Sequence, residues 1–164
     1  MPEARQIAID TSPIVAIVAA LGDLAVLQSV YDRVSVPFEV SQEILVDNAS
    51  RFAASEFEAD TWLHKETTPL DISPLLLNSL DRGEAAVIQL ALDRNISTVC
   101  IDESAGLRFA RLSGLSVTGT IGVLIRAKRS GYPLSMQAAI QNMQNREIRL
   151  SQSVIKFALE QTGE

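Results

Sequence analysis

Two short apolar segments of this sequence each end on an aspartate. IAID (7–10) and VCID (99–102) are runs of small and branched apolar residues, which is typical of strands buried on both faces of a parallel sheet. Ligands of such sheets bind in a crevice beyond the carboxyl ends of the strands, so Asp10 and Asp102 would face one crevice. The alternative is that each aspartate only caps the helix that follows it. Two aspartates after near-identical strands favour the shared site.

Two further acids fall on predicted helices. Glu84 shares a helical face with Ile88 and Ala91, which places it where the buried face meets the first turn. Asp81 and Glu84 also have the spacing of a capping box, which accounts for the same acid without a site. Glu43 lies near the edge of the apolar side of its helix. That position alone does not distinguish a solvated acid from one aimed into the crevice.

Carboxylates gathered in one pocket repel one another. Two unit charges about 4 Å apart cost about 4 kcal/mol at an effective dielectric near 20, so some must stay protonated or a cation must neutralise them. The sequence has one cysteine, Cys100, and one histidine, His64, which excludes an internal disulfide and a zinc site of soft ligands. Oxygen ligands favour Mg²⁺ or Mn²⁺, which can polarise a phosphate and activate water for hydrolysis.

Three residues next to these acids have possible supporting roles. Thr11 and Ser12 can cap the following helix and also hold Asp10 in place, and these two roles do not compete. Glu103 is either an extra acid at the rim of the site or part of a helix start.

The elements that must position these acids alternate along the chain. The patterns predict strands at 7–10, 34–36, 62–66, 98–102 and 116–118. They predict helices at 14–21, 23–31, 38–47, 51–59, 74–80, 83–94, 104–112, 120–128, 135–144 and 152–161. This alternation indicates an α/β, three-layer fold with a central, mainly parallel sheet flanked by helices. No linker or repeat divides the chain, so we expect residues 1–164 to form a single domain.

The composition indicates a soluble protein. Hydrophobic residues make up 47% of the chain, and the longest apolar run, 14–21, is shorter than the roughly 20 residues that span a bilayer. The first residues lack the apolar centre of a signal peptide, so we expect a cytoplasmic protein without membrane contact.

The charge is unevenly distributed. The net charge of −6 argues against a nucleic-acid partner at first sight. However, residues 1–103 hold 6 Lys or Arg and 17 Asp or Glu, whereas residues 104–164 hold 8 and 3. One part of the chain is therefore acidic and the other basic, which is more informative than the total.

Taken together and in order, several motifs resemble those of the PIN-domain family, and within it the VapC-like toxins of bacterial and archaeal toxin–antitoxin systems. The resemblance rests on DTSPIVAIVAALGDLAVL, VPFEVSQEI, LDRGEAAVIQLAL, CIDESAGLRFA and GLSVTGTIGVLIRAKRSG, which cover nearly the whole chain. It implies a PIN-like fold and a ribonuclease that depends on Mg²⁺ or Mn²⁺. The acids that match the family's quartet are Asp10, Glu43, Glu84 and Asp102.

The resemblance also implies partners and a supporting residue. Ser12 matches a small polar position that supports the first acid. The family implies an RNA substrate, a homodimer and a protein antitoxin that covers the site. The apolar helices within 14–31 could supply contact surface for these partners, or they could be core.

The basic part of the chain could hold the phosphate backbone of RNA. The residues that could form this positive rim are Arg108, Arg111, Arg126, Lys128 and Arg129. The alternative is that they lie on solvated helix faces. The start of the helix at 120–128 could also present backbone N–H groups to a phosphate.

The chain departs from the VapC-like pattern at two positions, and these departures keep a second function open. Cys100 stands where such chains often have Thr or Ser, and Glu103 stands where relatives often have Asp. The leading prediction is therefore a toxin that hydrolyses RNA phosphodiester bonds, and the alternative is a PIN scaffold that binds RNA or a protein without cutting. A fold that phosphorylates Asp10 ranks last, because Thr11 and Ser12 supply no second acid there.

Overall fold

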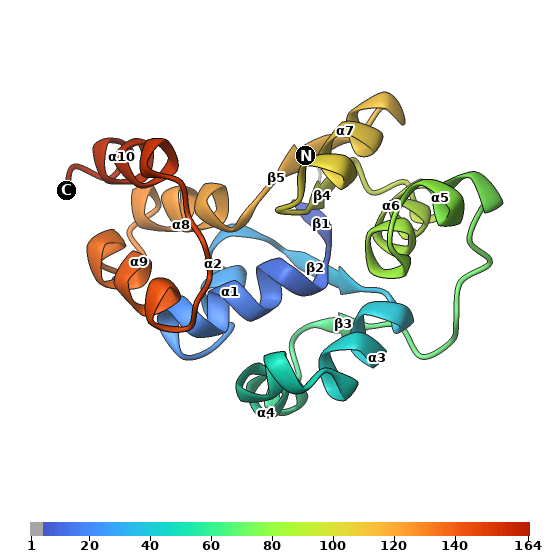
Figure 1. The fold of residues 1–164 in the computed structure, drawn as a ribbon, viewed down its shortest axis with the longest axis horizontal. Coiled ribbons are helices and arrows are strands. Elements are labelled where there is room, and N and C mark those ends of the chain that lie inside the picture. The colour runs from blue at the N-terminus through green and yellow to red at the C-terminus, as the bar shows by residue number, and fades with distance from the viewer. Residues whose placement is uncertain (1–4) are drawn as a thin grey trace.

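Five parallel strands form the centre of the fold. The computed structural model of the chain, which describes residues 5–164, orders them β3-β2-β1-β4-β5 (Figure 1). The strands are β1 (Gln6–Ile9), β2 (Arg33–Val36), β3 (His64–Lys65), β4 (Thr98–Cys100) and β5 (Ser116–Thr118). Each pairs in parallel with its neighbours. The predicted α/β fold with a central parallel sheet is confirmed.

Helices connect the strands and flank the sheet. The α-helices of the described residues are α1 (Thr11–Leu21), α2 (Val26–Val30), α3 (Phe38–Val46), α4 (Arg51–Ala59), α5 (Pro74–Ser79), α6 (Arg82–Arg94), α7 (Ser104–Leu112), α8 (Thr120–Arg129), α9 (Met136–Asn145) and α10 (Gln152–Gln161). A short 3-10 helix, η1 (Asn48–Ser50), leads into α4. None of these helices is long and apolar enough to cross a membrane.

The strand order places β1 in the middle of the sheet. From β1 the chain adds β2 and then β3 on one side, and it later adds β4 and β5 on the other. Ile9 pairs with Cys100, and the backbone N–H of Asp10 donates to the carbonyl of Cys100 at 3.0 Å. The carboxyl ends of β1 and β4 are therefore adjacent at the point where the strand order reverses, which is where ligands of such sheets bind.

Local capping sets the helices that start at this edge. Asp10 immediately precedes α1, which ends at Gly22, a residue in the left-handed region with φ 88°. Asp81 caps α6 by accepting a hydrogen bond from the backbone N–H of Glu84 at 2.8 Å. Asn95 ends α6 in the left-handed conformation with φ 55°. Both helices thus have defined ends, which places Asp10 directly before α1 and Glu84 in the first turn of α6.

Several predicted elements end a residue or two earlier in the structure, and two are shortened more. The helix expected at 23–31 begins only at Val26, because the Asp23 carboxylate accepts the backbone N–H of Ala25 and forms a turn. The strand expected at 62–66 is limited to His64–Lys65. The Asp60 side chain accepts the backbone N–H groups of Trp62 and Leu63, both at 2.9 Å, so the chain turns there before it can pair.

The core takes up the apolar strands and the helices packed on them. Ile7, Ala8 and Ile9 are fully buried, as expected for a central strand of a covered parallel sheet. Helix α6 packs on β1 and β4, and α1 packs on α3, α4 and α9. Most apolar side chains of α1 and α2 are buried within the chain, so they belong to the core.

Candidate metal centre

Asp10 links β1 to α1 and is buried. The residue is 4% exposed. The pKa of its carboxyl is raised to about 7, mainly by burial. The backbone N–H of Thr11 lowers this pKa, and the carboxylates of Asp81, Glu43 and Glu103 contribute smaller increases. Asp10 is thus a carboxyl group surrounded by other acids in a poorly solvated place.

Gly83 in the first turn of α6 leaves room for three of these carboxylates to converge. A Cβ atom at this position would lie 2.7 Å from Glu43 Oε2, 3.0 Å from Asp10 Oδ1 and 3.6 Å from Asp81 Oδ1. A side chain here would therefore displace the carboxylates of Glu43 and Asp10. Thr11 Oγ1 donates to Glu43 Oε2 at 3.0 Å, which ties the α3 acid to the start of α1. Helix α3 also packs against α6, so the convergence is built into the helix packing.

Glu43 is exposed to solvent, but its carboxylate belongs to this group of acids. The residue as a whole is exposed, yet the oxygen that bonds Thr11 points toward Gly83. Partial burial raises the pKa of the Glu43 carboxyl, and the hydrogen bond from Thr11 lowers it less strongly. Glu43 therefore reaches from solvent into the acidic group.

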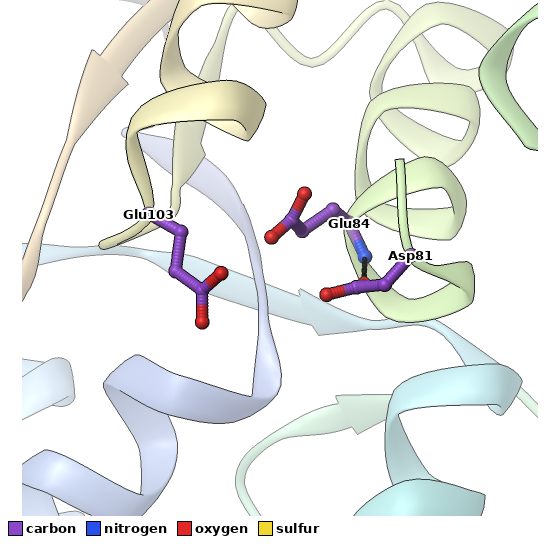
Figure 2. A group of neighbouring side chains, drawn as sticks. All are labelled: Asp81, Glu84 and Glu103. Atoms are coloured by element: carbon purple, nitrogen blue, oxygen red, sulfur yellow. Dashed lines mark hydrogen bonds between the residues drawn. The ribbon is translucent and has the colours of Figure 1, made fainter. Parts of the chain in front are cut away.

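Glu84 forms a second group with Asp81 and Glu103. Glu84 is 3% exposed, and burial raises the pKa of its carboxyl to about 8, with Asp81 the next largest cause. One carboxylate oxygen from each of Asp81, Glu84 and Glu103 lies within 4.8 Å of the other two. Figure 2 shows the carboxylates of Asp81 and Glu84, at the start of α6, facing Glu103, which precedes α7. Asp81 is both the cap of α6 and a member of both groups.

Asp102 belongs to the same edge but is held differently. Its two oxygens accept hydrogen bonds from Thr120, one from the backbone N–H at 2.8 Å and one from Oγ1 at 2.7 Å. Asp102 is exposed, and it lines a cavity of about 320 Å³ together with Glu43. This cavity, which we call the side cavity, is lined by Thr11, Ser12, Val15, Ala16, Glu43, Asp47, Ser50, Phe52, Asp102, Arg146 and Ile148. Asp102 is therefore outside the two groups of acids and shares the side cavity with Glu43.

Comparison with protein families identifies the fold. A family model described as "DUF3368: PIN domain" matches residues 6–164. The chain belongs to the PIN-domain family. No match was found among curated proteins. PIN domains are a nuclease-type fold and are typically metal-dependent, so the acidic groups of this PIN domain lie where a nuclease site is expected.

The chemistry of the donors fits a hard divalent cation. Carboxylate oxygens from the ends of β1 and β4 and from two helices surround one region, and Mg²⁺ and Mn²⁺ prefer such ligands. Two of the carboxyls, Asp10 and Glu84, have pKa values raised to about 7 and 8, because burial and like charges disfavour the ionised forms. A cation among them would remove that repulsion. The acidic cluster of this PIN domain could therefore bind a metal ion.

The basic residues predicted to bind RNA are divided between two ends of the PIN domain. Arg108 and Arg111 are exposed on α7, which starts directly after Glu103, and they line a cavity of about 420 Å³. Arg126 and Arg129 are in the last turn of α8 and line a cavity of about 660 Å³ with Arg5 and the first residues of β1, β4 and β5.

That second cavity lies at the amino ends of the strands, away from the acids. Lys128 pairs with Glu164 near the chain's end. The acids Asp10, Asp81, Glu84, Asp102 and Glu103 lie at the opposite edge of the sheet, which we call the acidic edge. The structure therefore does not bring Arg126, Lys128 and Arg129 to the acidic edge.

Three residues at the acidic edge were not singled out from the sequence as site residues. Asp81 was explained by capping, and its second contact depends on how α3 and α6 pack. Gly83 adjoins Glu84, and a glycine inside a helical pattern was the available signal for a close approach. Arg146 lines the side cavity although it follows Asp102 by 44 positions and belongs to no motif.

Proposed function

We propose that this PIN domain is a ribonuclease that depends on Mg²⁺ or Mn²⁺ and hydrolyses RNA phosphodiester bonds. The observation that supports this most directly is the convergence of Asp10, Glu43 and Asp81 over Gly83, beside the group formed by Asp81, Glu84 and Glu103. These acids come from segments far apart in the sequence. Structural acids seldom gather like this, because each raises the free energy of ionising the next.

Within this proposal, Asp10, Glu43, Glu84 and Asp102 hold the metal, as in the family quartet, and Asp81 and Glu103 add oxygens beside Glu84. A bound divalent cation supplies Lewis acidity toward phosphate oxygens and lowers the pKa of water. The chain's own residues orient these ligands. Thr11 fixes Glu43, and Thr120 fixes both oxygens of Asp102. Ser12 lines the side cavity next to them.

The test is RNA cleavage by purified protein in Mg²⁺ or Mn²⁺, with EDTA, and with Asp10→Asn. We expect cleavage only by the wild-type protein with metal, because the other two conditions remove the cation or one of its buried ligands. Isothermal titration with Mn²⁺ should show weaker binding for Asp10→Asn. Equal cleavage in all three conditions would reject the nuclease proposal.

A second candidate is a PIN scaffold that binds RNA or a protein without cutting. It is favoured by Asp102, whose two oxygens are already engaged by Thr120, and by Cys100 where VapC-like chains often have a hydroxyl residue. Such a scaffold needs no cation. Calorimetry that detects no Mg²⁺ or Mn²⁺ binding, with RNA binding intact, would favour it over the nuclease.

The toxin role is a narrower proposal. It includes a homodimer and a protein antitoxin that covers the acidic edge. The apolar side chains of α1 and α2 are largely committed to the core, so partners would use other apolar side chains, such as Leu75 on α5 and Phe157 on α10, which are 65% and 53% exposed. Expression in cells should be toxic, and a neighbouring small protein should relieve the toxicity. Harmless expression would reject the toxin role and leave the nuclease chemistry untouched.

A further inference from the structure

The side cavity is lined both by acids and by a flat cation. The acids include Glu43 and Asp102. The cation is the guanidinium of Arg146, which lies 4.2 Å from the ring centroid of Phe52. Val15, Ala16 and Ile148 add apolar surface, and Thr11 and Ser12 add hydroxyls. The cavity thus has both proposed metal-holding acids and an arginine over an aromatic ring in its wall.

The position of Arg146 is set by helix packing. Arg146 ends α9, which packs along α1, and Asn142 Nδ2 donates to the carbonyl of Ala20 at 2.9 Å. Phe52 is half-buried at the start of α4, which also packs on α1. Both residues therefore belong to segments that α1 brings together, and the first residue of α1, Thr11, donates to Glu43. Packing on α1 thus places the pair near the proposed metal-holding acids.

The size and charge of the side cavity limit what it can hold. Its volume of about 320 Å³ is at the low end of the range for small-molecule pockets, which suits a single nucleoside. Without a cation, the carboxylates of Glu43, Asp47 and Asp102 in the wall repel a bare phosphate, and a cation held by Glu43 and Asp102 would draw the phosphate to itself and not into the cavity. An uncharged flat ring meets no such repulsion. It can also stack on a guanidinium plane, as unpaired bases do in protein–RNA complexes.

We infer that the side cavity binds one unpaired nucleobase, stacked at Arg146 and Phe52. This base would lie next to the phosphate that is cleaved at the proposed metal site. This inference rests on the proposed function for the position of that phosphate. A base that stays paired in a duplex cannot enter the cavity, so the inference assigns Arg146 and Phe52 to one unpaired nucleotide beside that phosphate. Arg146 is a base-binding residue in this scheme.

The experiment measures binding rather than cleavage. Short fluorescent RNAs of one sequence, each lacking a different single base, are titrated by anisotropy against Asp10→Asn protein in Mg²⁺. Arg146→Ala and Phe52→Leu are added to this background, and Arg149→Ala is the matched control, since it removes an exposed arginine three residues further on that does not line the side cavity. Thermal unfolding checks that all variants are folded.

Removal of one particular base should weaken binding to the parent protein about 5-fold to 100-fold, the usual contribution of one stacked base. Arg146→Ala should weaken binding of the intact RNA by a similar factor, and the base removal should then have little further effect. Phe52→Leu should show part of this coupling, and Arg149→Ala none. A blunt duplex should be insensitive to Arg146→Ala.

Other outcomes separate this inference from the nuclease proposal. Equal losses for Arg146→Ala and Arg149→Ala, independent of any base and seen with duplex RNA, would mean that Arg146 contributes only charge and would overturn the inference. No effect of Arg146→Ala at any position would also overturn it. Base coupling at Arg146 in a protein that never cleaves RNA would support the side cavity while rejecting the nuclease function.

Discussion

At the carboxyl ends of the strands, Asp10 and Glu84 are buried next to other carboxyls, whereas at the amino ends Arg126 and Arg129 line a cavity with polar partners. Arg126 donates to the hydroxyl of buried Tyr31 at 3.1 Å, and Arg129 donates to Gln161. Each of these two arginines has a neutral partner. The acids instead raise one another's pKa values.

This difference indicates which end is arranged for stability and which for chemistry. A charge with a hydrogen-bond partner lowers the free energy of the fold or is neutral to it. A group of buried like charges raises that free energy unless a cation or protons neutralise them. The buried carboxyls of the acidic edge therefore lower the stability of the metal-free fold, which is a common feature of functional sites.

The largest effects on cleavage and stability should come from neutralising one charged side chain at each end of the sheet, Asp10 at the carboxyl ends and Arg126 at the amino ends. Loss of a residue that only supports a metal ligand typically costs roughly 10–100-fold, and Asp10→Asn should slow RNA cleavage by more than this because Asp10 is itself a proposed ligand. Without metal, the variant should be at least as stable as the wild-type protein. Arg126→Gln should weaken the part-buried hydrogen bond to the Tyr31 hydroxyl and cost about 0.5–1.5 kcal/mol, with cleavage little changed. Cleavage rates and urea unfolding at pH 8 measure both.

The result that breaks this comparison is a large loss of cleavage in folded Arg126→Gln. It would mean that Arg126 contacts RNA, as the sequence predicted, although it lies at the amino ends of the strands.

Gly83→Ala should reduce cation affinity by about 10–100-fold, because the new methyl group would displace the Glu43 and Asp10 oxygens that lie 2.7 and 3.0 Å from its position. Alanine is otherwise the better helix former by about 1 kcal/mol, so helix propensity cannot explain a loss. Calorimetry with Mn²⁺ measures the affinity.

Gly122→Ala is the matched control for this prediction. It also adds a methyl group to a helical glycine, but that group would meet the Thr118 hydroxyl at 2.7 Å instead of an acid. Equal loss of cation affinity in both variants would show that the effect comes from general strain and not from the acids over Gly83.

Stability of the metal-free protein should fall as the pH rises from about 4 to about 8. The pKa values of Asp10 and Glu84 are raised from 3.8 to about 7 and from 4.5 to about 8, so the folded state binds more protons than the unfolded state in this window. The stabilisation from protonated carboxyls is complete below the lower values and is lost as the pH passes the higher ones.

We expect a fall of at least about 1 kcal/mol, or roughly 2–4 °C in Tm. Added Mg²⁺ should reverse it at pH 8 and have little effect at pH 5, as scanning calorimetry can measure. A stability that rises steadily with pH, with no response to Mg²⁺, would contradict the description of the acidic edge.

The sequence allowed the architecture to be predicted because its signals are local. Apolar runs such as 7–10 and stops such as Gly22 depend on near neighbours along the chain. The two shortened elements arose from side-chain turns at Asp23 and Asp60, which compete with helix and strand by hydrogen bonds that the apolar pattern does not reveal.

The candidate site could be predicted only where strand ends set it. Asp10 and Asp102 follow adjacent strands, so parallel topology alone brings them to one edge. The meeting of Glu43 with Asp81 depends on α3 packing against α6, and Arg146 depends on α9 packing along α1. Such long-range packing leaves no pattern in neighbouring residues, which is why the sequence did not indicate that Arg146 lines the side cavity or that Arg126 lies away from the acids.

The smallest predicted effect concerns Glu164, which lies beyond the amino ends of the strands. Its contribution to stability has the opposite pH dependence to that of Asp10 and Glu84. Glu164 pairs with Lys128 and accepts the backbone N–H of Met136 at 2.6 Å, which lowers the pKa of its carboxyl from 4.5 to about 2. Because this pKa is lowered, the contribution is present above about pH 4.5 and is lost as the pH falls toward 2.

Glu164→Gln should therefore reduce stability slightly at pH 7, by less than about 1 kcal/mol, since the pair is close to solvent and screened. The difference from wild type should disappear near pH 2. Lys156→Gln, which removes an exposed charge 3.9 Å from Glu160, serves as the control and should have less effect. If Glu164→Gln instead altered stability most near pH 8, carboxyls at the two ends would respond to pH alike, and the division between stabilising and functional charges would fail.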